Sequence, residues 1–184
     1  MFLPVFPLPV FLLPNGVTRL RIFEPRYLKM VSIACQEQGF VLCVYDANSE
    51  HNVPAWGTWV DIIDFYQEGE ILHIDIKAKN LVNLYNVTFD DDNLRFANCE
   101  LIEHWPKQNN QQHHTQLAEK LKSIYQEYPE QAALYKQPEF TNPNWVCSRF
   151  LEMLPLSFEN KQLFAKEDSF QHADEFLQTM ILGK

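Results

Sequence analysis

Short apolar runs separated by turn residues fill the first half of the chain. In residues 71–77 the apolar side chains Leu72, Ile74 and Ile76 alternate with the polar side chains His73, Asp75 and Lys77. Alternation with a period of two predicts a strand with one buried face and one solvated face. Similar runs indicate further strands at residues 40–45, 58–65, 81–87 and 94–103. The pattern is typical of an antiparallel sheet.

The start of the chain is almost wholly apolar, but Pro4, Pro7 and Pro9 interrupt it. Proline cannot donate a hydrogen bond to a neighbouring strand, so residues 2–13 are predicted either to lie at a sheet edge or to have broken pairing, and we expect short, interrupted pairing. Turn residues at positions 14–16 separate it from a second extended piece at residues 18–23. Glu24 and Pro25 then begin a helix that Gly39 ends.

The second half of the chain has helical periodicity. Apolar side chains recur at helical spacing from Leu117 to Tyr125, and two further helices are predicted at residues 144–153 and 157–164. Residues 168–171 have the spacing of a capping box that begins a last helix. We therefore predict an α+β protein with a six-stranded, partly closed barrel and one crossing helix (residues 1–106). A polar linker (107–116) and a helical bundle packed on the barrel (117–184) follow.

The negative charge of the chain is concentrated in one segment. The net charge is −9, and residues 30–76 hold eight acidic residues but no lysine or arginine. Such a segment repels nucleic acid, whose binding depends on basic side chains, and can attract basic segments of a protein. The alternative is that acids on solvent-facing strand positions keep the protein soluble and block edge pairing.

Metal and cofactor sites are not expected. The four cysteines form no C-x-x-C pair and are interpreted as free, buried thiols. His113 and His114 could bind a metal with His104 or His51, but we interpret them as solvated loop residues. The aspartates at positions 90–92 lack the spacing of a calcium loop and are interpreted as a hairpin turn.

Catalytic motifs are also missing. The chain has no G-x-x-x-x-G-K-[ST] loop and no G-x-S-x-G elbow, and we expect no enzymatic activity. A catalytic site assembled in space is the alternative. The apolar start lacks a basic region before Arg19 and is broken by prolines, which is not typical of a signal peptide. We expect a cytoplasmic protein with no membrane segment.

Three regions of the chain carry recognisable motifs. The run from Phe2 to Pro9 leads into Leu20-Arg21-Ile22-Phe23-Glu24-Pro25-Arg26-Tyr27, Gly57-Thr58 begins an extended segment, and a helix ends in Leu154-Pro155-Leu156. Together, in this order, they resemble the Lon protease N-terminal domain, which has a similar G-T strand start. The motif residues that carry the resemblance are Glu24, Pro25, Arg26, Tyr27, Gly57, Leu154 and Pro155. At residues 78–82 the chain departs from the family, because the expected glycine and arginine are missing.

The resemblance implies a six-stranded pseudo-barrel related to the PUA domain, followed by helices. It implies a stand-alone, non-catalytic module that recognises unfolded polypeptide or a protein partner, as an adaptor or by presenting clients to a protease. PUA-like barrels also include nucleic-acid and small-ligand binders, which is the alternative. Only the basic cluster of Arg19, Arg21, Arg26 and Lys29 supports that alternative.

Aromatic side chains near the acidic strands are the candidate peptide-binding residues: Tyr45, Trp56, Trp59 and Tyr66. Flat aromatic rings provide contact area for an unfolded segment, and the nearby acids favour its basic side chains. The alternative is that Trp56 and Trp59 pack in the core or anchor loops. Glu24 and Arg26 have the same two interpretations, as a recognition pair or as residues that begin a helix.

Overall fold

The computed structural model describes residues 1–108 and 114–183. The chain divides into a barrel unit, Met1–Glu103, and a helical unit, His104–Lys184. Half of the predicted linker at residues 107–116, positions 109–113, lies outside the described residues, and its last two residues belong to a helix that begins at Thr115.

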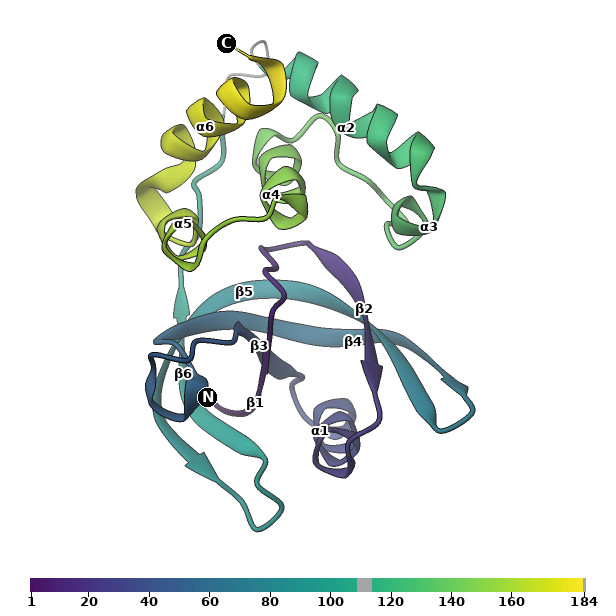
Figure 1. Ribbon diagram of the computed structural model, residues 1–184, viewed down its shortest axis with the longest axis vertical. Coiled ribbons are helices and arrows are strands. Elements are labelled where there is room, and N and C mark those ends of the chain that lie inside the picture. Colours follow the sequence, from purple (N-terminus) through teal and green to yellow (C-terminus); the bar gives the residue numbers. More distant parts are fainter. Residues whose placement is uncertain (109–113, 184) are drawn as a thin grey trace. The chain divides into compact units, whose positions relative to one another are not determined.

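The barrel unit contains six strands and one α-helix (Figure 1). The strands are β1 (Phe2–Leu8), β2 (Val17–Ile22), β3 (Phe40–Val44), β4 (Trp56–Glu68), β5 (Ile71–Phe89) and β6 (Arg95–Ile102). Their order in the mixed sheet is β2-β5-β4-β3-β1-β6, and a further pairing of β5 with β6 closes the sheet into a ring. The predicted six-stranded, barrel-like α+β fold is confirmed.

Strand β1 lies inside the sheet between β3 and β6, so the first of the two predicted alternatives, an edge position, is wrong. Residues 2–5 pair antiparallel with β6, and residues 5–8 pair in parallel with β3. Pro4 and Pro7 each fall within only one of these two ladders. The predicted short pairing is correct, because each side of β1 pairs over a few residues. A strand with staggered partners tolerates a missing amide on each side.

Strand β5 is one continuous element where two strands were predicted. It pairs with β2 at residues 72–77, with β4 at residues 71–83 and with β6 at residues 81–89. The register shifts between Trp59 and Val60, so Lys79 has no partner residue on β4 and forms a bulge. The strand therefore continues through residues 78–80 instead of ending there. The hairpin of β4 and β5 extends beyond the end of β3 as a long arm, and β2 pairs along its β5 side (Figure 1). We call residues 61–77 the arm.

Helix α1 (Pro25–Gln36) covers one face of this sheet. Its buried side chains Tyr27, Met30, Val31 and Ala34 pack with Phe6, Phe40, Ile74, Ile76 and other apolar residues of the strands. On the opposite face a second apolar cluster joins β1, β3, β5 and β6 through side chains that include Val5, Val41, Val82 and Cys99. Both faces of the ring are therefore apolar, which holds its curvature.

The helical unit contains α2 (Thr115–Glu127), α3 (Pro129–Ala132), α4 (Pro143–Met153), α5 (Phe158–Phe164) and α6 (Phe170–Leu182). Helix α4 contacts both α2 and α6 (Figure 1). Asn142 and Ser157 cap the N-termini of α4 and α5 through their side-chain oxygens. The predicted capping box of α6 is wrong: the Ser169 hydroxyl accepts a hydrogen bond from Trp105 and donates one to Lys166 O. Among the described residues, no helix is long and apolar enough to cross a membrane.

Candidate functional site

The structure separates the four predicted aromatic residues. Tyr45 follows β3 and Tyr66 lies near the end of β4, and both rings are about half exposed. Trp56 is only 6% exposed and packs edge-on against Phe11, with 6.1 Å between ring centroids. Its burial agrees with the second of the two interpretations, a core residue, because β4 begins within the apolar core.

Trp59 is half-buried and held by local contacts. Its indole N–H donates to Gln38 O at 2.5 Å, and the ammonium of Lys79 lies 3.7 Å from the ring centroid. Lys79 also pairs with Asp61 at 3.2 Å. Trp59 and Tyr66 are seven positions apart on β4, roughly 20 Å along an extended chain. One short peptide segment does not stack on both rings at once.

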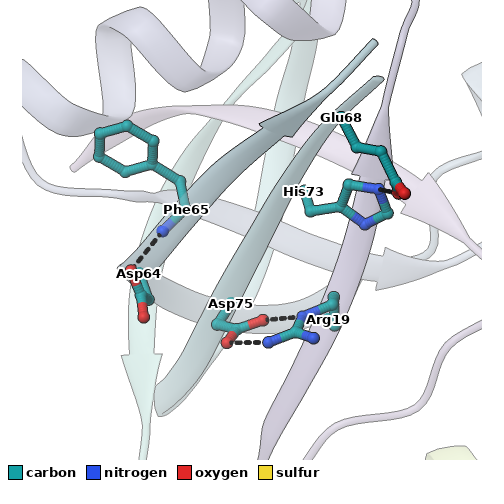
Figure 2. A network of polar contacts seen from close by, with 6 residues as sticks. All are labelled: Arg19, Asp64, Phe65, Glu68, His73 and Asp75. Carbon is teal, nitrogen blue, oxygen red and sulfur yellow. Dashed lines mark hydrogen bonds and ion pairs between the residues drawn. The ribbon is translucent and has the colours of Figure 1, made fainter. Parts of the chain in front are cut away.

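Tyr66 on β4 contacts a polar network that joins β2 and β5; Figure 2 shows Arg19, His73 and Asp75 of this network. The ring of Tyr66 stacks on His73 with 4.5 Å between centroids, and the Arg19 guanidinium lies 5.2 Å from the Tyr66 centroid. Arg19 donates to both carboxylate oxygens of Asp75, at 2.6 and 2.8 Å. These hydrogen bonds raise the pKa of Arg19 above its ordinary value. The network keeps Tyr66 in a fixed orientation.

His73 and Asp75 are buried, so the predicted solvated face of β5 is wrong at these positions. The contacts of Tyr66 with His73 and of Arg19 with Asp75 connect both side chains to neighbouring strands. Nε2 of His73 also lies 3.2 Å from a Glu68 carboxylate oxygen, although the pair lacks hydrogen-bond geometry within the described residues. Long side chains from adjacent strands shield a face that alternation alone assigns to water.

The outer part of the arm combines exposed apolar and acidic side chains. Every residue from Ile63 to Glu70 is exposed, and Phe65 is 64% exposed. Ile63, Phe65 and Tyr66 provide the apolar area, and Asp64, Glu68 and Glu70 provide the charge. Phe65 pairs with Ile74 whereas Tyr66 pairs with His73, so the two rings lie on opposite faces of the arm. A ligand at the outer edge of β4 could therefore contact both rings.

That edge of β4 carries no partner strand in the described part of the chain. Residues 61–68 pair only with β5, because β3 ends its pairing at Val60. A register shift leaves Ile63 outside the ladder, and the Phe65 amide donates to its neighbour Asp64 at 2.8 Å (Figure 2). The bulge and this carboxylate restrict the addition of another strand. Contacts at this edge are therefore made mainly by side chains.

Sequence reasoning missed Ile63 and Phe65 because it assigned residues 58–65 to a regular strand. One signal was present: the Ile62-Ile63 doublet breaks the alternation, which is typical of a bulge. After the bulge, Phe65 pairs with the core residue Ile74 and shares its face of the sheet, but it lies near the tip of the hairpin and is exposed.

A separate cleft of about 410 Å³ lies between residues 49–55 and residues 84–87 of β5. Tyr85 lines it and is about half exposed. His51, Asn52 and Asn86 adopt positive φ angles around it. None of the four predicted aromatic residues lines this cleft, which makes it a second place to test for binding.

The motif residues have structural roles that their contacts explain. Arg26 pairs with Glu24 at 2.8 Å, and Tyr27 is buried with its ring 3.9 Å from that of Phe6. Pro25 occupies the first turn of α1. A Cβ on Gly57 would lie 2.6 Å from Cγ1 of Val41, so only glycine fits between β3 and β4 there. Leu154 ends α4 in an extended conformation, directly before Pro155.

The basic cluster is largely neutralised by acidic partners. Arg19 pairs with Asp75 and Arg26 with Glu24, while Lys29 pairs with Asp90 at 2.8 Å and also contacts Asp92. These last two aspartates belong to the β5–β6 hairpin turn, as predicted. Three of the four cations therefore have their charge balanced within the barrel unit, which leaves little attraction for a phosphate backbone.

Nucleophilic cysteine chemistry is not supported by the thiol environments. Cys43, Cys99 and Cys147 are buried, as expected, whereas Cys35 is exposed. Burial raises the pKa of Cys43 to about 12 and also raises that of Cys147. A thiol with a raised pKa is a poor nucleophile at neutral pH. His114, expected to be a solvated loop residue, is buried, and His113 lies outside the described residues.

Comparisons with known proteins agree with this architecture. Residues 2–172 match the family model of the ATP-dependent protease La (LON) substrate-binding domain. The crystal structure of a Lon N-terminal domain protein from Xanthomonas campestris is similar, with a TM-score of 0.71, 25% identity and coverage of 98% of both chains. The N-terminal domain of a Mycobacterium avium complex Lon protease shares the fold, with a TM-score of 0.67, 11% identity and coverage of 97% of this chain and 96% of that one.

No curated protein sequence matches the chain. The family model nevertheless covers both the strand-rich part and most of the helices, and the first of the two structures is aligned along almost the whole length of each chain. The chain belongs to the family of the ATP-dependent protease La (Lon) substrate-binding domain.

Proposed function

We propose that this protein binds polypeptide segments without catalysis, and that the outer edge of β4 on the arm is the contact surface. The observation that carries the proposal is the run of exposed side chains at Ile63, Phe65 and Tyr66 beside acidic residues. Exposed apolar area of this kind, mixed with charge, is characteristic of protein interaction sites. Membership of a substrate-binding family supports polypeptide as the ligand class.

The charge on the arm favours segments that contain both apolar and basic side chains. Asp64, Glu68 and Glu70 surround the exposed rings, and the part of the chain from residue 30 to residue 76 has no lysine or arginine. Lysine and arginine side chains of a bound segment would meet complementary charge, which raises the association rate and selects against acidic segments. A role as an adaptor, or in presenting clients to a protease, would follow from such binding.

The fixed orientation of Tyr66 also supports this surface. Because Arg19 and His73 already hold the ring, little conformational entropy is lost when a segment stacks against its exposed side. Phe65 has no comparable ring or cation contact in the described residues, and its exposed area makes it the larger source of apolar contact.

Binding of two fluorescent synthetic peptides tests the proposal. Both peptides are unfolded and have the same apolar residues, but one carries lysine and arginine where the other carries glutamate. We expect saturable anisotropy changes with the basic peptide and much weaker binding of the acidic one. Phe65→Ser removes the most exposed ring of the arm and should weaken binding about tenfold, the loss of one hot-spot contact.

Two matched variants locate the surface. Tyr128→Ser removes another well-exposed aromatic side chain, in the helical unit, and should leave the affinity unchanged. Tyr85→Ser alters the cleft beside β5. If Tyr85→Ser weakens binding and Phe65→Ser does not, the arm is the wrong site. If neither peptide binds but a short structured RNA binds with a steep salt dependence, the nucleic-acid alternative replaces the proposal.

A further inference from the structure

Three potential metal ligands meet inside the helical unit. They are His114, the residue directly before α2, Cys147 on α4 and Asp174 on α6. One donor atom from each, an imidazole nitrogen, the thiol sulfur and a carboxylate oxygen, lie within 4.8 Å of one another. The three residues come from distant parts of the sequence, so their meeting is a property of the fold.

The cluster is largely shielded from water. His114 is 8% exposed and Cys147 is fully buried, while the Asp174 side chain is 23% exposed. Within the described residues, Nδ1 of His114 is buried and has no hydrogen-bond partner. A buried nitrogen of this kind is costly unless another group satisfies it. The one open side of the cluster is at the carboxylate.

The spacing of the donor atoms suits a tetrahedral ion. Nδ1 of His114 lies 3.4 Å from Oδ1 of Asp174, but the two atoms are too poorly aligned to form a hydrogen bond. Two ligands that are each about 2.0–2.1 Å from a tetrahedral zinc ion lie about 3.4 Å apart. The Cys147 sulfur lies within 4.8 Å of a donor atom of each of the other two residues, and on metal binding it would lie about 2.3 Å from the ion.

Neighbouring residues already orient the donors. The Gln178 amide approaches Oδ1 of Asp174 from one turn further along α6, at 3.4 Å. The ring of Phe170 lies 5.8 Å from that of His114, measured between centroids, and limits its rotation. Supporting contacts around the ligands are a usual feature of protein metal sites.

We propose that His114, Cys147 and Asp174 bind one Zn²⁺ ion, with water as the fourth ligand on the exposed side of Asp174. A thiolate, an imidazole and a carboxylate together favour zinc over magnesium or calcium, which prefer oxygen ligands. On binding, the Cys147 thiol gives up its proton to solvent and a Zn–S bond replaces the S–H bond. The ion would tie α2, α4 and α6 together.

Metal titration of the full chain tests this site. The exposed Cys35 is first changed to serine, so that a surface thiol cannot bind the added metal. Zinc is removed with a chelator and then titrated against a competing chromophoric chelator, and cobalt is titrated separately. We expect one zinc ion per chain and, with cobalt, a sulfur-to-metal charge-transfer band in the near ultraviolet.

Variants assign the ligands. Cys147→Ser should abolish the charge-transfer band, and His114→Gln and Asp174→Asn should each weaken zinc binding at least about tenfold. Cys99→Ser removes a buried thiol in the barrel unit and should change neither result. Circular dichroism checks that each variant is folded. Asp174→Asn alters the most exposed of the three ligands. If the two buried substitutions unfold the helical unit, the zinc affinity of folded Asp174→Asn tests the site.

Absence of stoichiometric zinc binding in the Cys35→Ser protein would overturn the proposal. Zinc binding that is the same in folded Asp174→Asn or Cys147→Ser would also overturn it, because the metal would then bind elsewhere. The polypeptide-binding assay is independent of these outcomes, since the arm lies in the barrel unit.

Discussion

His104 connects the stability of the helical unit to pH. Its Nε2 lies 3.0 Å from the Phe164 carbonyl oxygen, which can only accept, so this nitrogen carries the proton of a neutral ring. The ring stacks on Trp105 with 4.4 Å between centroids. Burial lowers the pKa of His104 to about 4 from its ordinary value of 6.5.

We predict that His104 destabilises the protein in mild acid. Between about pH 6.5 and pH 4 the unfolded chain binds a proton at this residue and the folded chain does not, so stability falls as the pH falls. The loss approaches about 3 kcal/mol near pH 4. Urea unfolding at pH 7 and pH 4.5 measures it.

His104→Gln keeps an amide donor near Phe164 but cannot be protonated, and it should flatten this pH dependence. His172→Gln changes an exposed histidine of α6 and provides the control. Equal acid sensitivity in the wild type and His104→Gln would show that other groups dominate.

Residue patterns predicted which side chains are apolar but not which polar side chains are covered. His73 and Asp75 alternate with Ile74 and Ile76, and this alternation predicts water on one face. These two side chains contact Tyr66 and Arg19 on neighbouring strands. The pattern of a single strand does not show which side chains of neighbouring strands will cover it. The metal cluster was missed for the same reason, since its ligands share no local motif.

At the scale of elements, α4 is organised around a buried ion pair. Arg149 is 1% exposed and donates to both oxygens of Glu152, each at 2.7 Å. Its guanidinium also lies 5.4 Å from the ring centroid of Trp145 and 5.8 Å from that of Tyr135. Arg149 therefore makes both an ion pair with Glu152 and cation–π contacts with two aromatic rings.

We predict that Arg149→Met destabilises the protein by about 3 kcal/mol, because Glu152 keeps its charge and loses its cation. The double variant Arg149→Met with Glu152→Met should be less destabilised than Arg149→Met alone, since no uncompensated charge is then buried. Chemical unfolding of the single and double variants gives both values. A double variant that is the more unstable of the two would contradict this account.

The positions of the strands along the sequence were predicted more reliably than the strands with which each one pairs. The apolar run at the start was correctly assigned as a strand with short pairing, but its prolines suggested an edge. Staggered pairing with β6 and β3 depends on where those strands lie, which local composition does not contain. In the same way, Lys79 was interpreted as part of a break, although a bulge accommodates it within β5.

For the whole molecule, charge distribution should govern which segments bind. The net charge of −9 is almost entirely contributed by residues 30–76, which include most of the arm. In the barrel unit, several basic residues near the acidic strands are paired, as in Arg19 with Asp75 and Lys29 with Asp90. The outer part of the arm, residues 61–70, contains acidic residues and no lysine or arginine.

We predict that salt weakens binding of the basic peptide. Raising NaCl from about 50 to about 300 mM should reduce its affinity several-fold, because exposed charges are then screened beyond a few ångströms. A neutral peptide with the same apolar residues should lose little. Glu70→Gln should reduce the salt dependence of the basic peptide, and an unchanged dependence would place the relevant charge elsewhere.

The interior position of β1 also has a consequence during synthesis. Residues 5–8 cannot pair until β3 has been synthesised, and residues 2–5 cannot pair until β6 has left the ribosome. An apolar strand without partners is prone to associate with other nascent chains. Pro4 and Pro7 lack the amides that such association requires. The prolines that complicate the native ladder therefore protect the chain while the ring is still open.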